Sequence, residues 1–598
     1  MKHQVALLAA ALVAACATAP YRFDPAPAEA PEASSGHAAK PGWATREFAV
    51  AAASPLAAAA GHGILKSGGS AIDAAIAVQM VLALVEPQSS GVGGGALLLH
   101  FDGRDVEAWD GRETAPAQAH ENLFIGADGK PIAFPDAMVN GRAVGVPGAV
   151  RMLEEAHRRH GKLPWARLFD PAIALAEQGF AVSPRLETLL KGDVHLRKDP
   201  SAARYFFEAD GSAKKAGTPL RNPELAAVLR RIATEGSKAL HEGPIAQAIV
   251  DKVSAGPAGP TPMTLADLAG YRPQERAPLC HDYQAREKAY RICGFPPPSS
   301  GAIAIGQILG ILARTRADAL PLENGLPSAD WLHLYTEAAR LAFADRAQYI
   351  GDPDFVQPPA GRWTSLLEPA YLGQRAQLIG ERSMKVAMAG SPAGETARYA
   401  PAAHQPEYGT SHISIVDAQG RAVEMTTTIE AQFGSRRMVS PGGGLGGFLL
   451  NNELTDFSFV PQDAQGRPVA NRVQPGKRPR SSMSPTLVFD KATGRLLMGA
   501  GSSGGAVIVH HTAKTLYGVL HWGLDIQQAI DLPNFASLNG PSLLEKGRFP
   551  LATVQALRAR GAEVREQEMT SGLQGIQRTP TGFFGGADPR REGVVRGD

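Results

Sequence analysis

The chain has 598 residues, of which 44% are hydrophobic and 20% charged, with 60 Lys and Arg against 58 Asp and Glu. A chain of this length can bury a large core. The formal net charge of +2 excludes a strongly basic nucleic-acid-binding protein, and the apolar content excludes a wholly disordered chain. We therefore expect a globular enzyme without a nucleic-acid partner.

Only three cysteines are present, and none belongs to a Cys-x2-Cys pair. Three cysteines are too few for a disulfide scaffold, and their spacing does not match that of zinc ligands. The sequence thus predicts no metal site and no cofactor.

The N-terminus has the pattern of a targeting segment. Eleven apolar residues, 5–15, follow Met-Lys-His-Gln, which is shorter than the roughly 20 residues that span a bilayer. The sequence Val-Ala-Ala before Cys16 resembles the lipobox of bacterial lipoproteins, in which the cysteine is acylated. We predict a signal peptide over 1–15, lipidation of Cys16 and a disordered Ala/Pro-rich tether over 16–44. The mature protein would then be exported to the periplasm. Only this lipid would hold it on a membrane, which we expect to be the outer one. A plain signal peptide with a chance cysteine is the alternative.

Residues 69–85 predict a buried helix with a polar start, and 96–101 predict a strand. The glycines between them, at 91 and 93–95, favour a tight turn that lines a pocket over a nucleotide loop, because no Gly-Lys-Ser/Thr follows. From about 145 to 350 the pattern is mostly helical. Within it, His157 and His160 share one helix face beside two arginines, and we expect both histidines to face solvent rather than to bind a metal.

Two strand-like runs that carry Cys280 and Cys293 flank a polar segment, 284–288. If the two cysteines lie opposite each other, their numbers place the centre of the hairpin between Arg286 and Glu287. In an oxidising compartment a disulfide would stabilise the hairpin by about 3 kcal/mol. Two free buried thiols are the alternative.

A second hairpin is predicted over 410–428. Two alternating runs are joined by Ala-Gln-Gly, which places Gly at the left-handed position of a three-residue loop. With Gln419 at its centre, Ile415 faces Val423 and Thr410 faces Thr428. Two threonine hydroxyls are therefore expected to meet at the open end of the hairpin.

Several ordered motifs surround this hairpin. They lie at 111–116 (GRETAP), 296–301 (PPPSSG), 409–412 (GTSH), 451–457 (NNELTDF), 477–486 (KRPRSSMSPT), 501–505 (GSSGG) and 585–591 (GGADPRR). Over about 45–598 the sequence resembles γ-glutamyltransferase (γ-glutamyltranspeptidase), of the N-terminal-nucleophile (Ntn) hydrolase superfamily.

The resemblance implies an α+β fold, a four-layer αββα sandwich, and a precursor that cuts itself between Gly409 and Thr410. A large chain, 45–409, and a small catalytic chain, 410–598, would then form one heterodimeric body. A freed α-amine can act as the base for its own hydroxyl, so Thr410 would be the nucleophile. Thr428 would orient that hydroxyl, and the N–H groups of Gly504 and Gly505 would form the oxyanion hole.

The substrates implied are γ-glutamyl compounds such as glutathione, and the acceptors are water, amino acids or peptides. Such a donor carries an α-carboxylate and an α-ammonium, which need a fixed cation and fixed anions. The residues that match the family's substrate-binding positions are Arg112, Ser481 and Ser482 for the carboxylate, and Glu430, Glu453 and Asp456 for the ammonium.

The sequence departs from the family pattern at three places. Glu430 stands where many members have Asn, residues 459–476 form a short segment without the tyrosine of a lid, and Ser503 and Ala506-Val507 flank the paired glycines in place of a commoner Pro and Ser-Arg. The alternatives are a same-fold acylase for glutaryl or cephalosporin-type amides, a transpeptidase acting on poly-γ-glutamate, and a non-catalytic binding lipoprotein.

Overall fold

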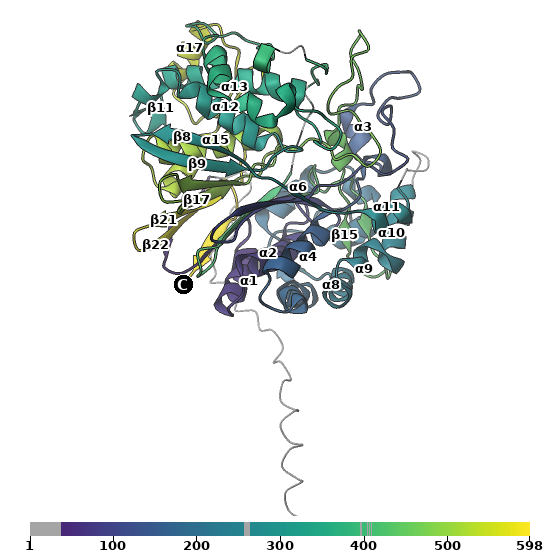
Figure 1. The fold of residues 1–598 in the computed structure, drawn as a ribbon. Coiled ribbons are helices and arrows are strands. Elements are labelled where there is room, and N and C mark those ends of the chain that lie inside the picture. Colours follow the sequence, from purple (N-terminus) through teal and green to yellow (C-terminus); the bar gives the residue numbers. More distant parts are fainter. Residues whose placement is uncertain (1–36, 256–262, 395–396, 404, 406, 408) are drawn as a thin grey trace, which may run out of the picture.

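The computed structural model describes residues 37–255, 263–394, 397–403, 405, 407 and 409–598. Two seven-stranded sheets lie face to face, with helices on the outer side of each (Figure 1). This is the αββα sandwich predicted above, so the fold class is confirmed. The predicted signal peptide and Cys16 lie outside the described residues.

The first sheet is antiparallel throughout and has the Thr410 hairpin near its centre. Its spatial order is β23 (Val594–Gly597), β2 (Ala49–Ala52), β12 (Ser411–Val416), β13 (Ala422–Thr428), β3 (Gly95–Phe101), β4 (Val106–Gly111) and β7 (Gln274–Arg276). Ile415 is the partner of Val423 in the β12–β13 ladder, which confirms the predicted register.

The second sheet is also antiparallel. Its spatial order is β1 (Trp43–Thr45), β22 (Gly582–Ala587), β21 (Gln574–Thr579), β17 (Leu496–Gly501), β16 (Thr486–Asp490), β9 (Lys288–Gly294) and β8 (Leu279–Ala285). Shorter strands lie outside the two sheets: β5 (Phe180–Ala181), β6 (Pro219–Leu220), β10 (Leu322–Glu323), β11 (Leu326–Pro327), β14 (Met438–Val439), β15 (Phe448–Leu449), β18 (Phe535–Ala536), β19 (Ser542–Glu545) and β20 (Val564–Gln567).

Helices from the first half of the chain lie on the side of the first sheet (Figure 1). They are α1 (Pro55–Lys66), α2 (Ala71–Val85), α4 (Ala149–His160), α5 (Asp170–Gln178), α6 (Pro184–Gly192), α7 (Pro200–Phe206), α8 (Pro223–Glu235), α9 (Lys238–His241), α10 (Gly243–Ser254) and α11 (Leu265–Gly270). The predicted helix at 69–85 is α2. Ser70 and Asp73 cap its start reciprocally, and every residue of the helix is buried.

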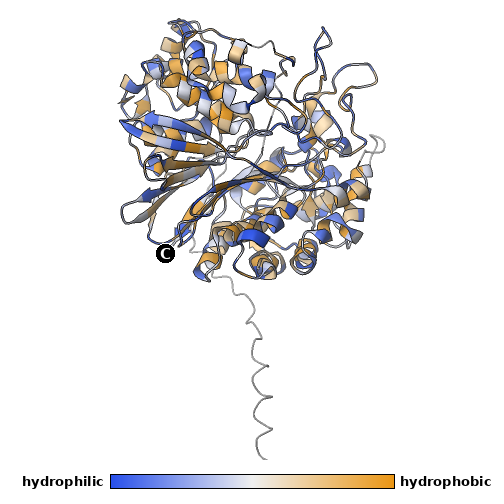
Figure 2. Ribbon diagram, in the orientation of Figure 1, coloured by the Kyte–Doolittle hydropathy of each residue, from blue (hydrophilic) through white to orange (hydrophobic). Residues whose placement is uncertain are grey.

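The opposite outer layer contains α12 (Gly301–Leu312), α13 (Ala329–Tyr349), α14 (Pro369–Ala376), α15 (Ile508–Leu520), α16 (Ile526–Asp531) and α17 (Leu551–Ala559), and α3 (Phe134–Met138) stands apart. Separate apolar clusters fill the two helix–sheet interfaces and the space between the sheets. Figure 2 shows hydrophobic residues along the strands and the helices that cover them. Burial of apolar surface in three layers thus holds the sandwich together.

The folded body begins earlier than predicted. Trp43–Thr45 forms β1 and pairs with Phe583–Gly585 of β22, and the N–H of Ala38 donates to the carbonyl of Pro589. The prediction that the tether extends to residue 44 is therefore wrong at its end, because backbone pairing to a distant strand leaves no local signal. None of the described helices is both long enough and apolar enough to cross a bilayer.

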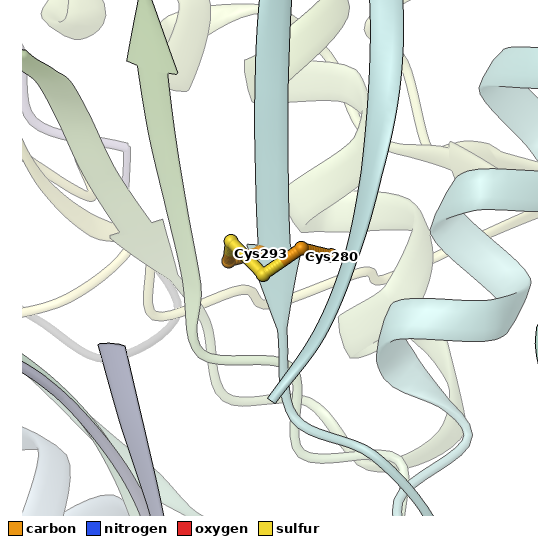
Figure 3. Close-up of a disulfide and its surroundings, with 2 residues drawn as sticks. All are labelled: Cys280 and Cys293. Carbon is orange, nitrogen blue, oxygen red and sulfur yellow. A yellow bond between two sulfur atoms is a disulfide. The ribbon is translucent and has the colours of Figure 1, made fainter. Parts of the chain in front are cut away.

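Cys280 and Cys293 lie opposite each other on β8 and β9 and are joined by a disulfide (Figure 3). The β8–β9 ladder is continuous from the pair Leu279 and Gly294 to the pair Ala285 and Lys288. Arg286 and Glu287 form the turn, and both have positive φ. The bond links the edge strand β8 to the strand that pairs with β16 inside the second sheet.

Candidate active site

The two threonines meet at the open end of the β12–β13 hairpin. The hydroxyl of Thr410 donates to that of Thr428 over 3.5 Å. Thr428 also accepts a 2.8 Å hydrogen bond from the N–H of Glu430, which fixes its oxygen. The hairpin loop is set by Asp417, whose carboxylate accepts from the N–H groups of Gln419 and Arg421. Local turn chemistry therefore places the two hydroxyls.

The backbone at the predicted cleavage site is strained. Thr410 has a φ of 131° and Gly409 a φ of 60°, and a β-branched residue at positive φ is energetically costly. A Cβ on Gly409 would come within 2.1 Å of the carbonyl oxygen of Glu430, so only glycine fits there. The carbonyl of Thr410 accepts from Arg591 over 3.3 Å. The peptide bond 409–410 is thus held in a high-energy conformation beside the Thr410 hydroxyl.

A buried cation and two acids lie next to the threonines. Arg112 follows β4, is 1% exposed and donates to Glu453, and over 2.5 Å to Asp456. Its remaining hydrogen bonds include the carbonyls of Pro479 and Arg480. Although burial alone would lower the pKa of Arg112, the two carboxylates raise it above its usual value. The guanidinium therefore stays charged and anchors both acids.

Within the described part of the chain, neither Glu453 Oε2 nor Asp456 Oδ1, both buried, accepts a hydrogen bond from an N–H group. The buried carboxyl of Glu113 lies beside Glu453, and burial and Glu453 raise its pKa well above the usual value. Burial raises the pKa of the carboxyls of Glu453 and Asp456, and Arg112 opposes that shift. Buried acceptors without donors are costly, and an ammonium group supplies several donors. The pair is therefore arranged to receive a small cationic group.

A second cationic region, which no sequence motif predicted, lies beside the threonine pocket. Arg346, near the end of α13, donates to Ser482 over 2.5 Å, to Ser300 over 2.9 Å and to Glu407 over 2.7 Å. Burial and the nearby Arg346 lower the pKa of Arg480 to about 9. Arg346 belongs to an otherwise mostly apolar helix and lies 64 residues before Thr410 in the chain, so no local pattern marked it.

Glu407 occupies this second cationic region in the uncut chain. Burial alone would raise the pKa of its carboxyl, but Arg346 and Arg480 lower it below the usual value. The side chain also lines the small pocket that contains the threonines. An acidic group is therefore already bound where the site offers two guanidinium groups and the hydroxyl of Ser482.

The structure brings the predicted site residues together. A pocket with about 20 Å³ of free volume is lined by nine of the ten predicted catalytic and substrate-binding residues, which are Arg112, Thr410, Thr428, Glu430, Glu453, Asp456, Ser481, Ser482 and Gly505. The tenth, Gly504, lines an adjoining cavity of about 780 Å³ together with Gly409, Gln432 and Met569. This larger cavity has the volume of a small-molecule site.

The departures from the family pattern occupy defined positions. Glu430 accepts from the side-chain amide of Asn452 and has a φ of 72°. In the short segment after Asp456, Phe459 is buried and stacks on Phe124 with ring centroids 4.3 Å apart. The start of this segment is therefore anchored to the body by aromatic packing.

The prediction for the two α4 histidines is wrong. The side chains of His157 and His160 are each only 15% exposed, and each contacts a carboxylate, Asp73 at 3.5 Å and Glu107 at 2.6 Å respectively. The helix sequence carried no sign of these partners, because Asp73 and Glu107 come from α2 and β4.

The chain is similar to known proteins both in sequence and in fold. A family model described as Gamma-glutamyltranspeptidase matches residues 57–597. The chain is 35% identical to a glutathione hydrolase proenzyme of Bacillus subtilis (strain 168), with 92% of this chain and 91% of that protein covered. It is 34% identical to Acylase ACY 1 proenzyme of Pseudomonas sp. (strain V22), covering 89% and 90%. A crystal structure of a cephalosporin acylase from Bacillus halodurans superposes with a TM-score of 0.79 at 27% identity, covering 97% and 99%.

Proposed function

Because the chain belongs to the gamma-glutamyltranspeptidase family, we propose that it moves γ-glutamyl groups from glutathione or a related donor to water, an amino acid or a peptide. The observation that carries this proposal is the contact between Thr410 and Thr428 inside a pocket that also holds Arg112, Glu453 and Asp456. A nucleophile and a site for a zwitterion are thereby combined.

The first step is self-cleavage. The hydroxyl oxygen of Thr410 attacks the carbonyl carbon of Gly409, the peptide C–N bond breaks, and the hydroxyl proton passes to the released amine. Water then hydrolyses the ester, which frees the carboxylate of Gly409 and restores the Thr410 hydroxyl. The strained backbone at these two residues favours this step, because cleavage relieves the strain.

In turnover, the new α-amine of Thr410 takes the proton from its own hydroxyl, which attacks the γ-carbonyl of the donor. The N–H groups of Gly504 and Gly505 stabilise the negative charge that develops on the carbonyl oxygen. The departing amine takes up the proton and leaves a γ-glutamyl ester on Thr410. Water or an acceptor amine then attacks this ester and regenerates the hydroxyl, which Thr428 holds in place.

The donor's α-amino acid end is bound by charge. The carboxylates of Glu453 and Asp456 accept hydrogen bonds from its ammonium, with Glu430 nearby. Its carboxylate pairs with Arg112 and with the Ser481 and Ser482 hydroxyls. Arg346, which already contacts Ser482, adds a second positive charge on the carboxylate side once cleavage releases Glu407.

An acylase activity is the second candidate. Acylase ACY 1 of Pseudomonas is as similar in sequence as several glutathione hydrolases, and the cavity of about 780 Å³ beside Gly504 has room for a large leaving group. A glutaryl side chain has no ammonium group. Glu453 and Asp456 would then face an apolar chain with unpaired acceptors, which disfavours glutaryl amides relative to γ-glutamyl amides.

We also propose that the chain is exported as a lipoprotein, with Cys16 acylated and the mature protein held in the periplasm by its lipid. In cells labelled with a fatty acid, the wild type should carry the label and be found in the membrane fraction. The Cys16→Ser variant should be unlabelled and be found in the soluble periplasmic fraction. Soluble, unlabelled wild-type protein would contradict the anchor.

The test of function compares the purified chain from residue 17 onward with its Thr410→Ala variant. We expect intact mass to show two fragments for the wild type, the smaller beginning at Thr410, and one for the variant. Only the wild type should release the chromophore from a γ-glutamyl anilide. A single inert chain in both samples would contradict the enzyme, and cleavage with turnover of a glutaryl amide alone would establish the acylase.

A further inference from the structure

Three potential metal ligands lie together away from the Thr410 pocket. His100 and Glu107 are direct partners on β3 and β4, and His160 is the last residue of α4. One ligand atom from each residue lies within 4.8 Å of the other two. The cluster is assembled from three elements, so its residues are 7 and 53 positions apart in the sequence and form no motif.

The distances are close to those of a metal site. Glu107 Oε2 lies 2.6 Å from His160 Nε2 and 3.8 Å from His100 Nδ1, and the two imidazole rings have centroids 4.2 Å apart. Ligand atoms at 2.0–2.2 Å from a tetrahedral zinc ion are roughly 3.3 Å from one another. Shifts of several tenths of an ångström in each side chain would therefore admit an ion.

One ligand atom is buried and faces a carboxylate oxygen at 3.8 Å, beyond hydrogen-bond distance. His100 is 1% exposed, and its Nδ1, which faces Glu107, has no hydrogen-bond partner among the described residues. An unpaired buried imidazole nitrogen is costly, since water cannot reach it. A metal ion between His100 and Glu107 would satisfy this lone pair.

The surroundings favour a cation held by these three side chains. His160 ends α4, where the helix dipole places partial negative charge. Glu107 Oε2 accepts a 3.1 Å hydrogen bond from the indole N–H of Trp109, and Oε1 accepts one from Arg159 at 3.4 Å. These bonds orient the carboxylate with Oε2 toward the histidines.

We propose that His100, Glu107 and His160 bind a divalent first-row transition metal ion of the zinc type. Two imidazoles and one carboxylate suit such ions, whereas Ca²⁺ and Mg²⁺ require mainly oxygen ligands. Glu107 and His160 keep 17% and 15% of their side chains exposed, so solvent water completes the coordination.

The position of the site indicates its effect. Gly95, at the start of β3, pairs with Thr428, and His100 is five residues further along the strand, roughly 17 Å at the rise of an antiparallel strand. The ion is therefore too far away to take part in the threonine chemistry. It would tie the end of α4 to the β3–β4 hairpin, and it would stabilise the fold by mass action.

The experiment titrates Zn²⁺ into chelator-treated full-length protein by isothermal titration calorimetry. We expect saturable binding of one ion to the wild type and a loss of at least tenfold in affinity for Glu107→Gln and His160→Ala. His120→Ala, at an exposed position, should bind as the wild type does. Ca²⁺ and Mg²⁺ should give no saturable heat.

A second measurement reports the type and number of ligands directly. Co²⁺ bound by the wild type should give the visible absorption of a four- or five-coordinate nitrogen–oxygen site, and this band should be absent in both variants. Zn²⁺ affinity that is unchanged in Glu107→Gln and His160→Ala, or no saturable binding at all, would overturn the proposal. Turnover of the γ-glutamyl anilide is a separate readout, so failure of the metal site leaves the enzymatic proposal standing.

Discussion

Thr410 has a positive φ because its neighbours leave no other path for the chain. Gly409 passes directly over the carbonyl of Glu430, while the next residue enters β12 and must pair with β13. The turn into the strand is therefore concentrated in two residues, one of which is β-branched. Strain of about 1–3 kcal/mol at such a residue is available to the cleavage step.

Gly409→Ala should abolish or greatly slow self-cleavage. The added Cβ would lie 2.1 Å from the carbonyl oxygen of Glu430, so the backbone must move and carry the 409 carbonyl away from the Thr410 hydroxyl. Gel analysis of freshly purified protein over time measures the fraction cut. We expect mainly uncut chain after the wild type has been fully processed.

The matched control is Gly443→Ala. Gly443 also has a positive φ of 71°, but a Cβ there meets nothing within 4 Å. Alanine at position 443 therefore imposes the same conformational cost as alanine at 409, but without a steric contact. Cleavage at the wild-type rate in Gly409→Ala would show that the close approach to Glu430 does not position the reacting carbonyl.

At the scale of elements, the β8–β9 hairpin is held at the sheet edge by pairing on one side only. β8 is the last strand of the second sheet, and β9 pairs with β16. Cys293 packs with Phe295 and Leu487 in the cluster between the sheets. The disulfide therefore connects an edge strand to the interior.

Replacing both cysteines by alanine should destabilise the folded protein by about 3 kcal/mol, the chain-entropy value for a loop of this length. Alanine keeps the buried position of Cys293 apolar. Thermal unfolding under oxidising conditions should show a melting temperature several degrees below that of the wild type.

The control adds a reductant to both proteins. The melting temperature of the wild type should fall most of the way to that of the double variant, whose own melting temperature should not change. Equal melting temperatures for wild type and variant under oxidising conditions would show that the cross-link does not restrict the unfolded chain appreciably.

At the scale of the whole molecule, the C-terminal motif at 585–591 is structural as much as functional. Asp588 is buried and accepts from Ser571 at 2.5 Å, from the N–H of Leu573 at 2.9 Å and from Arg590. Arg590 in turn pairs with Glu545. This network connects β22 to the segments that precede β21 and to β19.

The Asp588 network should make stability depend on pH in acid. Although burial alone would raise it, Arg590 and Ser571 lower the pKa of Asp588 from 3.8 to about 2. A carboxyl with a lowered folded pKa contributes stability above about pH 4 and loses it as pH falls toward 2. Asp588→Asn should therefore cost about 2 kcal/mol at pH 7, and the difference should shrink as the pH is lowered from 5 toward 2.

Denaturant unfolding of both forms, in the uncleavable Thr410→Ala background, measures this difference. Asp105→Asn, at a side chain that is 74% exposed, serves as the control and should follow the wild type at every pH. A constant difference between Asp588→Asn and the wild type across this range would refute the electrostatic explanation.

Features that depend on neighbours in the chain were predictable from the amino-acid order. Turn residues at 417–420 fixed the hairpin, its register and hence the meeting of Thr410 with Thr428, because strand pairing across a short loop has one register. A polar segment between two strand-like runs likewise predicted the hairpin that carries Cys280 and Cys293. Ordered motifs gave the family, and with it the sandwich and most residues of the pocket.

Contacts between residues far apart in the chain became visible only in the folded molecule. Arg346 of α13 donates to Ser482, and β1 pairs with β22. His160 lies beside His100 and Glu107. No local sequence pattern predicts any of these contacts. Strain at Thr410 likewise depends on Glu430 lying against Gly409. Periodicity shows which face of an element is buried, but it does not identify the partner, because hydrophobic packing is non-directional and many pairings would bury the same surface.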